Sequence, residues 1–171
     1  MIRTILVPLD GSEFSERALP VGIELATALN ARVVLVSVAG SESAIPLKLT
    51  PEDRREISEQ YADVEEEEEV LSTEPRMVER AQEQIRAVDE AEEYLASIAA
   101  KLSDTGVQIE VAAPYGPAVE GILSEIDLRS ADLVVMCTHG RSGLNRLISG
   151  SVASAVLAHS PVPVLMVPPD K

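Results

Sequence analysis

The residues best suited to chemistry lie between positions 136 and 151, in a segment that combines glycine, serine and arginine. Three glycines let the backbone turn sharply and let a ligand approach the main chain closely: Gly140, Gly143 and Gly150. Residues 133–136 predict a buried strand before the segment, and a helix is predicted to begin near Ser151 and Val152, where the first N–H groups have no helical partner. Because a strand, a glycine loop and a helix N-terminus in this order bind anions, the segment predicts a phosphate site. An ordinary glycine-rich connection is the alternative.

The charges around this loop favour an anionic ligand. Residues 133–160 include Arg141 and Arg146 but no Asp or Glu, although the formal net charge of the whole chain is -15. Arginine forms strong hydrogen bonds with phosphate oxygens. We therefore expect at least Arg141 to contact phosphate rather than only solvent.

Other chemistries find less support in the same segment. It lacks the Gly-Lys-Ser/Thr ending of a Walker P-loop, and its serines have no recognisable general base, so no nucleophile is assigned. His139 has no cysteine or carboxylate partner at metal-ligand spacing, and only His159 lies elsewhere, so no metal site is expected. Cys137 is either a redox-sensing thiol near arginines and helix dipoles or a small buried residue at a strand end.

The composition favours a single domain with an aliphatic core. Of the 171 residues, 46% are hydrophobic but only 2% are aromatic, which suits a parallel sheet packed from Val, Ile, Leu and Ala. No Trp, one Phe and a pI near 4.4 argue against nucleic-acid binding. No apolar run approaches the roughly 18 to 20 residues of a membrane span. Met1 leads directly into a predicted strand rather than a signal peptide, so we expect a cytoplasmic protein without membrane contact.

Most of the negative charge lies in one segment. Residues 51–93 contain 17 acidic and 5 basic side chains, and the rest of the chain contains 12 acidic and 9 basic. We interpret residues 1–171 as one near-neutral domain with an acidic insertion at about residues 41–80. Five consecutive glutamates at 65–69 repel one another, so about residues 51–71 form either a helix or a solvated, mobile segment. Because this charge repels an anionic ligand, we expect the insertion to lie away from the phosphate loop.

Hydrophobic periodicity divides the rest of the chain into alternating strands and helices. Strands are predicted at residues 2–9, 32–38, 107–112, 133–136 and 161–167, with 107–112 at an edge of the sheet. Helices are predicted from Ser12 or Ser15 to Ala28, from a restart at 72–75 to Leu102, at 118–128 and at 151–158. Pro20 predicts either a kink or a helix that begins near it. In the long helix the apolar stripe is convincing only after Val88, so its first half is predicted to project beyond the sheet.

Strands that alternate with helices, without hairpin signals, predict an α/β fold with an open, doubly wound sheet of five parallel strands and helices on both faces. Ligands of such sheets bind at the carboxyl ends of strands, next to the point where the strand order reverses. Asp10, Val38 and the loop after Met136 all lie at such ends. Asp10 is therefore either a ligand contact or a turn carboxylate that accepts hydrogen bonds from nearby N–H groups.

Three ordered blocks of this sequence resemble the universal stress protein family. They are residues 5–12 (ILVPLDGS), residues 138–144 with 146–147 and 150–152 in the loop, and residues 161–167 (PVPVLMV). The resemblance covers residues 1–167 apart from the insertion. Members of the nucleotide-binding branch have a glycine, two residues, a second glycine, nine residues and then Gly-Ser or Gly-Thr. Gly140 and Gly150-Ser151 match this pattern, whereas Cys137 occupies the first glycine position.

The resemblance implies strand order 3-2-1-4-5, ATP, possible Mg²⁺, and a homodimer formed through the last strand, between Val162 and Val167. Position by position, it implies Pro8 and Asp10 beside the adenosine, Val38 against the adenine, and Met136 and Cys137 beside the ribose. The residues that it implies around the phosphates are Gly140, Arg141, Gly150, Ser151 and Val152, and Gly143 belongs to the same loop.

Three functions remain open at this point. The prediction is an ATP-binding stress-response or regulatory protein that is not primarily a catalyst. One alternative is an interaction module without nucleotide, in which Cys137 closes the site and the acidic insertion recruits a protein partner. The other is an enzyme, a slow ATPase with at most weak hydrolysis.

Overall fold

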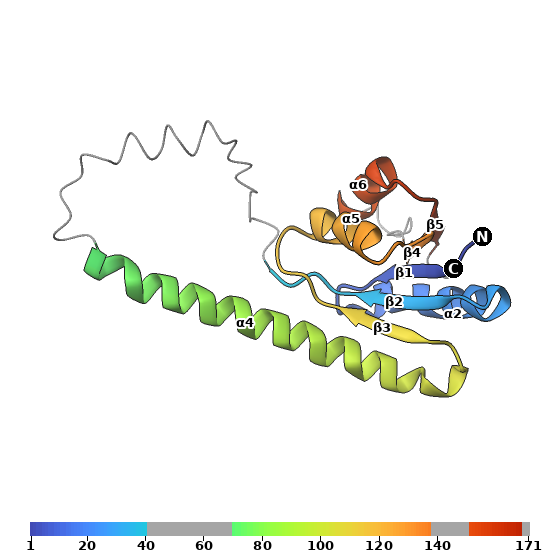
Figure 1. Ribbon diagram of the computed structural model, residues 1–171, viewed down its shortest axis with the longest axis horizontal. Helices are drawn as coiled ribbons and strands as arrows, with labels where there is room; N and C mark the ends of the chain where they lie inside the picture. Colours follow the sequence, from blue (N-terminus) through green and yellow to red (C-terminus); the bar gives the residue numbers. More distant parts are fainter. Residues whose placement is uncertain (41–69, 138–150, 169–171) are drawn as a thin grey trace, which may run out of the picture.

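The computed structural model describes residues 1–40, 70–137 and 151–168, with the backbone alone described at 70–81 and 151. Five parallel strands form one open sheet in the order β3-β2-β1-β4-β5 (Figure 1). The strands are β1 (Thr4–Pro8), β2 (Arg32–Val36), β3 (Ile109–Ala112), β4 (Leu133–Cys137) and β5 (Val164–Val167). The predicted fold class and the strand order implied by the resemblance are both confirmed.

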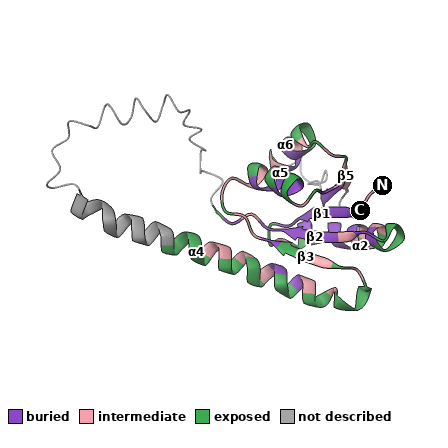
Figure 2. Cartoon of the chain, in the orientation of Figure 1, coloured by how far each residue is buried: buried purple, intermediate pink, exposed green. Residues whose placement is uncertain are grey.

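Alternating side chains of each strand enter two separate cores, one on each face of the sheet. Ile5 and Val7 pack with α2 (Ala18–Leu29) and the second half of α4 (Val70–Lys101). Leu6 lies between them in sequence and packs on the other face with α5 (Ala118–Leu128) and α6 (Ser151–His159). Burial on both faces explains why β1 and β4 read as continuous apolar runs (Figure 2).

The first helical segment is divided near Pro20. A short helix, α1 (Glu13–Glu16), is capped by Ser12, whose side chain accepts a hydrogen bond from the N–H of Ser15. The longer α2 begins at Ala18, so Pro20 lies in its first turn, where a missing N–H removes no helical hydrogen bond. Of the two predicted outcomes, a helix that begins near Pro20 is therefore observed.

The long helix α4 begins earlier than predicted. It runs from Val70 through residues 72–75, so the predicted restart there was wrong. Pro75 lies in the second turn, where its missing N–H costs only one hydrogen bond near the helix end. Residues 41–69, which hold most of the predicted insertion and of the helix predicted at 51–71, lie outside the described residues.

The predicted division of α4 into two halves is confirmed. Leu95 and Ile98 are fully buried, whereas the Ile85 side chain is 61% exposed. The first half of the helix extends past the edge of the sheet (Figure 1). Neither α4 nor any other helix in the described parts of the chain is long and apolar enough to cross a membrane.

The strand ends differ from the prediction at both edges of the sheet. β5 begins at Val164 rather than at residue 161, because Pro161 and Pro163 have no N–H to donate to a neighbouring strand. β3 begins at Ile109, after a 3₁₀ turn, η1 (Ser103–Thr105), and Gly106, which has a left-handed backbone with φ of 73°. Its position at an edge, where it pairs only with β2 among the described strands, confirms the edge-strand prediction.

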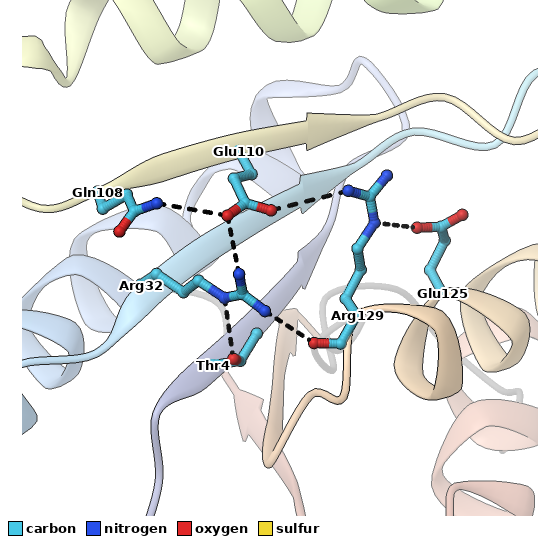
Figure 3. A network of polar contacts seen from close by, with 6 residues as sticks. All are labelled: Thr4, Arg32, Gln108, Glu110, Glu125 and Arg129. Atoms are coloured by element: carbon cyan, nitrogen blue, oxygen red, sulfur yellow. Dashed lines mark hydrogen bonds and ion pairs between the residues drawn. The ribbon is translucent and has the colours of Figure 1, made fainter.

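A polar network ties the amino ends of the strands to the end of α5 (Figure 3). Arg32 Nη1 donates to Glu110 Oε1 at 2.9 Å, and Arg32 Nε donates to Thr4 Oγ1 at 3.1 Å. Arg129 Nε donates to Glu125 Oε2 at 3.0 Å, and its Nη1 lies 3.7 Å from Glu110 Oε2. Glu110 is consequently half-buried rather than solvated, although the alternating pattern of β3 suggested a wet face there.

Candidate functional site

A cavity of about 410 Å³ lies at the carboxyl ends of β1, β2 and β4, where the strand order reverses. Five separate parts of the chain contribute described residues to it: the β1–α1 turn, the end of β2, the N-terminal half of α5, the end of β4 and the start of α6. Its lining residues are Pro8, Leu9, Asp10, Phe14, Ser15, Val36, Ser37, Val38, Gly40, Ala118, Ile122, Met136, Cys137, Val152 and Ala153. Open parallel sheets bind their ligands at this place.

The structure brings six of the predicted site residues together around this cavity: Pro8, Asp10, Val38, Met136, Cys137 and Val152. Ser151 is the first residue of α6, directly before Val152. The remaining candidates, Gly140, Arg141, Gly143 and Gly150, lie outside the described residues.

Asp10 is held by the turn that follows β1. Its Oδ1 accepts hydrogen bonds from Ser12 N at 3.0 Å and from Ser12 Oγ at 2.5 Å, and its own N–H donates to Ser15 Oγ at 3.2 Å. Partial burial raises the pKa of Asp10, but the hydrogen bonds from Ser12 and Ser15 outweigh it and leave the pKa below its usual value. The carboxylate is therefore ionised at neutral pH.

These contacts combine the two interpretations of Asp10. Oδ1 accepts the hydrogen bonds of the turn, as the interpretation of Asp10 as a turn carboxylate predicted. Both hydrogen bonds that Ser12 donates to the carboxylate engage Oδ1 rather than Oδ2. An ionised oxygen at the rim of a cavity is suited to accept hydrogen bonds from ligand hydroxyl groups.

The wall of the cavity is mainly apolar. Val38, two residues after the end of β2, is half-buried, and Ile122 and Met136 are buried. Gly121 lets α5 approach this wall, because a Cβ at this glycine would lie 2.8 Å from a Val38 methyl carbon. A mainly apolar lining that includes the Asp10 carboxylate suits a ligand with a flat apolar ring and several hydroxyl groups.

Several lining residues were not predicted from the sequence. Phe14 and Ser15 come from α1, and Ala118 and Ile122 come from α5. The signal for α5 was a glycine inside a helical pattern, Gly121, which indicates close approach of another element. The α1 residues carry no comparable signal, because the sequence pattern indicates Ser15 only as a possible start of the first helix.

A second cavity, of about 640 Å³, lies at the amino ends of the strands and contains none of the predicted residues. Two of its charged residues are engaged within the fold: Arg32 in the network above, and Asp132 with the N–H groups of Arg3 and Thr4. We therefore place the candidate site at the carboxyl ends. In the described parts of the chain, no group of three or more His, Cys, Asp or Glu residues is arranged to hold a metal ion.

The model of the universal stress protein family matches residues 1–168. The chain belongs to the universal stress protein family. Among curated members, it is 28% identical over 168 residues to the stress response protein NhaX of Bacillus subtilis, with 95% of this chain and 96% of that protein covered. A universal stress protein of Mycolicibacterium smegmatis is 38% identical over 73 residues, which cover 42% of this chain and 56% of that protein.

Solved structures of the universal stress protein family share the fold. The structure of the Methanocaldococcus jannaschii protein MJ0577 matches with a TM-score of 0.64 and 24% identity, and covers 100% of this chain and 99% of that chain. A universal stress protein in complex with cAMP matches with a TM-score of 0.55 and 22% identity, and the match covers 99% of this chain and 98% of that chain. An Arabidopsis thaliana member with AMP bound matches with a TM-score of 0.54 and 16% identity, and the match covers 98% of this chain and 92% of that chain.

Proposed function

We propose that this chain binds an adenine nucleotide, ATP in particular, in the carboxyl-end cavity and serves as a regulatory protein of the stress response rather than mainly as a catalyst. The observation that carries the proposal is the convergence of Pro8, Asp10, Val38, Met136, Cys137 and Val152, from four parts of the chain, on one cavity. The universal stress proteins with bound cAMP and AMP support a nucleotide as the class of ligand.

The chemistry of the lining fits the nucleoside part of such a ligand. The apolar wall at Val38 and Ile122 suits the adenine ring, and the ionised Asp10 is suited to the ribose hydroxyls. The N-terminus of α6 lies beside the cavity at Val152, where helix N–H groups favour phosphate. The phosphate roles of Gly140, Arg141, Gly143 and Gly150 rest on the sequence, since residues 133–160 contain two arginines and no acid.

A regulatory role fits the ionisable groups of the site. In the described part of the lining, the Asp10 carboxylate accepts hydrogen bonds from Ser12 within its own turn, which suits a residue that shapes a binding site. Mg²⁺ is proposed as the companion of the ATP phosphates. We also propose that residues 1–171 form one domain, with about 41–80 as an insertion into it.

Calorimetric titration tests the proposal. We expect ATP, with and without Mg²⁺, to release or absorb heat on binding and to raise the melting temperature. Parallel titrations with AMP and cAMP compare their affinities with that of ATP and so show how much the phosphate groups contribute to binding. Asp10→Ala should weaken binding at least tenfold, because it removes a charged acceptor from the cavity. Asp127→Ala, on the exposed side of α5, is the control and should bind as the unmodified protein does. If millimolar ATP produces no heat and no shift of the melting temperature, the proposed function is wrong.

We further propose that two copies of the chain form a dimer through β5. This strand is at the edge of the sheet and pairs only with β4 among the described strands. Leu165 on it is 38% exposed, and Val164 and Met166 are half-buried. An edge strand with apolar side chains and unpaired backbone groups is a common surface for association.

A further inference from the structure

Tyr94, on the buried half of α4, contacts the short helix that follows Asp10. Its hydroxyl donates a hydrogen bond to Glu16 Oε1 at 3.0 Å, across 78 positions of sequence. Its ring is half-buried and packs against the core beneath α2 and α4. The bond therefore joins α4 to the segment that provides Asp10, Phe14 and Ser15 to the cavity.

That segment fixes Asp10 through bonds within a single turn. Ser15 Oγ accepts from Asp10 N and donates to the carbonyl oxygen of Ser12 at 2.9 Å, while Ser12 holds the Asp10 carboxylate. A helix as short as α1, four residues, is not stable alone. Its position depends on contacts with neighbouring elements, and the Tyr94–Glu16 bond is one that reaches it from across the molecule.

We propose that Tyr94 is a positioning residue for the nucleotide site. By holding Glu16, it fixes α1, and through Ser12 and Ser15 it fixes the orientation in which Asp10 meets the ligand. This inference rests on the proposed function, because it assigns Tyr94 a role in binding at the same cavity.

The electrostatics of the phenol agree with a donor role. Burial raises the pKa of Tyr94, and the hydrogen bond to Glu16 and the charge of Asp10 raise it further, against a smaller opposing effect of Ser15. The hydroxyl therefore keeps its proton throughout the physiological range. It is a permanent donor to Glu16, and its influence on Asp10 does not depend on a change of its own charge.

Tyr94→Phe tests the proposal, because it keeps the ring and removes only the donated hydrogen. The dissociation constants for ATP and AMP are measured by calorimetry, and amide hydrogen exchange is followed at Asp10 and Ser12. We expect the dissociation constants to rise roughly three- to tenfold, as for partial loss of a bond to a charged group. We also expect faster exchange at Asp10 and Ser12, with no change in the middle of β1.

Matched variants separate this role from simple stabilisation. Tyr115→Phe removes a hydroxyl that has no hydrogen-bond partner among the described residues and should change neither readout. Glu16→Gln keeps an acceptor oxygen and should bind much as the unmodified protein does, whereas Glu16→Ala should reproduce Tyr94→Phe. The double variant Tyr94→Phe/Glu16→Ala should be no worse than either single variant, since both remove one bond.

Two negative outcomes have different meanings. If the unmodified protein binds nucleotide and Tyr94→Phe lowers the melting temperature without changing the dissociation constant or the exchange at Asp10, Tyr94 is only structural and the inference is overturned. If the unmodified protein binds neither nucleotide, the proposed function is overturned, and the binding role of Tyr94 with it.

Discussion

Cys137 ends β4 at the position where the resemblance implies a glycine. It is only 8% exposed and forms part of the cavity wall, so its side chain takes up space that a glycine would leave to the ligand. We expect Cys137→Gly to bind ATP more tightly. We also expect it to lower the free energy of unfolding by about 1 kcal/mol, because glycine in a strand gains backbone entropy on unfolding. Calorimetry and thermal unfolding measure the two effects, with Cys137→Ser as a control of nearly equal size. Weaker binding by Cys137→Gly would show that the side chain contributes to the site.

Asp132, before β4, makes the stability depend on pH. Hydrogen bonds from Arg3 N, at 2.7 Å, and Thr4 N, at 3.0 Å, lower its pKa below the usual 3.8. A carboxylate whose pKa is lower in the folded state stabilises the fold above its unfolded pKa and loses this effect as the pH falls through the folded value. Below about pH 4, the unmodified protein should therefore lose stability more steeply than Asp132→Asn, which does not titrate. Urea unfolding between pH 3 and 6 measures this, and an equal slope for the two proteins would contradict it. Asp104→Asn, at an exposed carboxylate without a hydrogen-bond partner among the described residues, is the control.

At the scale of elements, the packing of α5 against Val38, two residues after the end of β2, depends on Gly121. A Cβ at this position would lie 2.8 Å and 2.9 Å from the two Val38 methyl carbons, so either the helix or the cavity wall must move. We expect Gly121→Ala to lower the free energy of unfolding by about 1–3 kcal/mol, as for overpacking, although alanine is the better helix former. Nucleotide binding should weaken as well, because Val38 lines the cavity. Chemical denaturation and calorimetry test both effects. Ser124→Ala, at an exposed position of the same helix, should be neutral or slightly stabilising.

The network at the amino ends joins β2, β3 and α5 through Glu110. Its side chain is 29% exposed and forms ion pairs with both Arg32 and Arg129, so loss of its charge affects two ion pairs. We expect Glu110→Gln to lower the free energy of unfolding by about 1 kcal/mol, a value reduced by the partial exposure of all three groups. The loss should shrink at high salt, which denaturation at two ionic strengths can measure. Arg86→Gln is the matched control, since the Arg86–Glu90 pair on α4 is more than 70% exposed on both sides. A loss of equal size in this control would show that the network has no special role.

At the scale of the whole molecule, the proposed dimer is open to a direct test. Light scattering after size exclusion should give twice the mass of the 18.3 kDa chain. Leu165→Arg should shift the mass toward that of the monomer, because it places a charge in the middle of the apolar edge strand. Leu128→Arg, at a 71% exposed position on α5, should leave the mass unchanged. A monomeric unmodified protein at micromolar concentration would contradict the proposal.

The sequence predicted most accurately the parts that are decided by local periodicity. The runs around Leu6 and Val134 are buried on both faces, which gives a strong apolar signal, and their alternation with helices specifies a parallel sheet. Because the carboxyl ends of such strands meet at one edge, Asp10, Val38 and Met136 were placed at the same site. Strand ends were less accurate, since they depend on hydrogen bonds with a neighbouring strand. The bond between Tyr94 and Glu16 joins elements 78 positions apart, and no local pattern indicates it.

The length of α4 has a consequence for how the molecule moves in solution. Its 32 residues form a rod of about 48 Å at 1.5 Å per residue. A compact chain of this size would have a radius of gyration of about 16 Å. With half of the rod beyond the sheet, the protein should tumble anisotropically, fastest about the helix axis and more slowly end over end. Its hydrodynamic radius consequently reports the extension of this helix as well as the number of subunits.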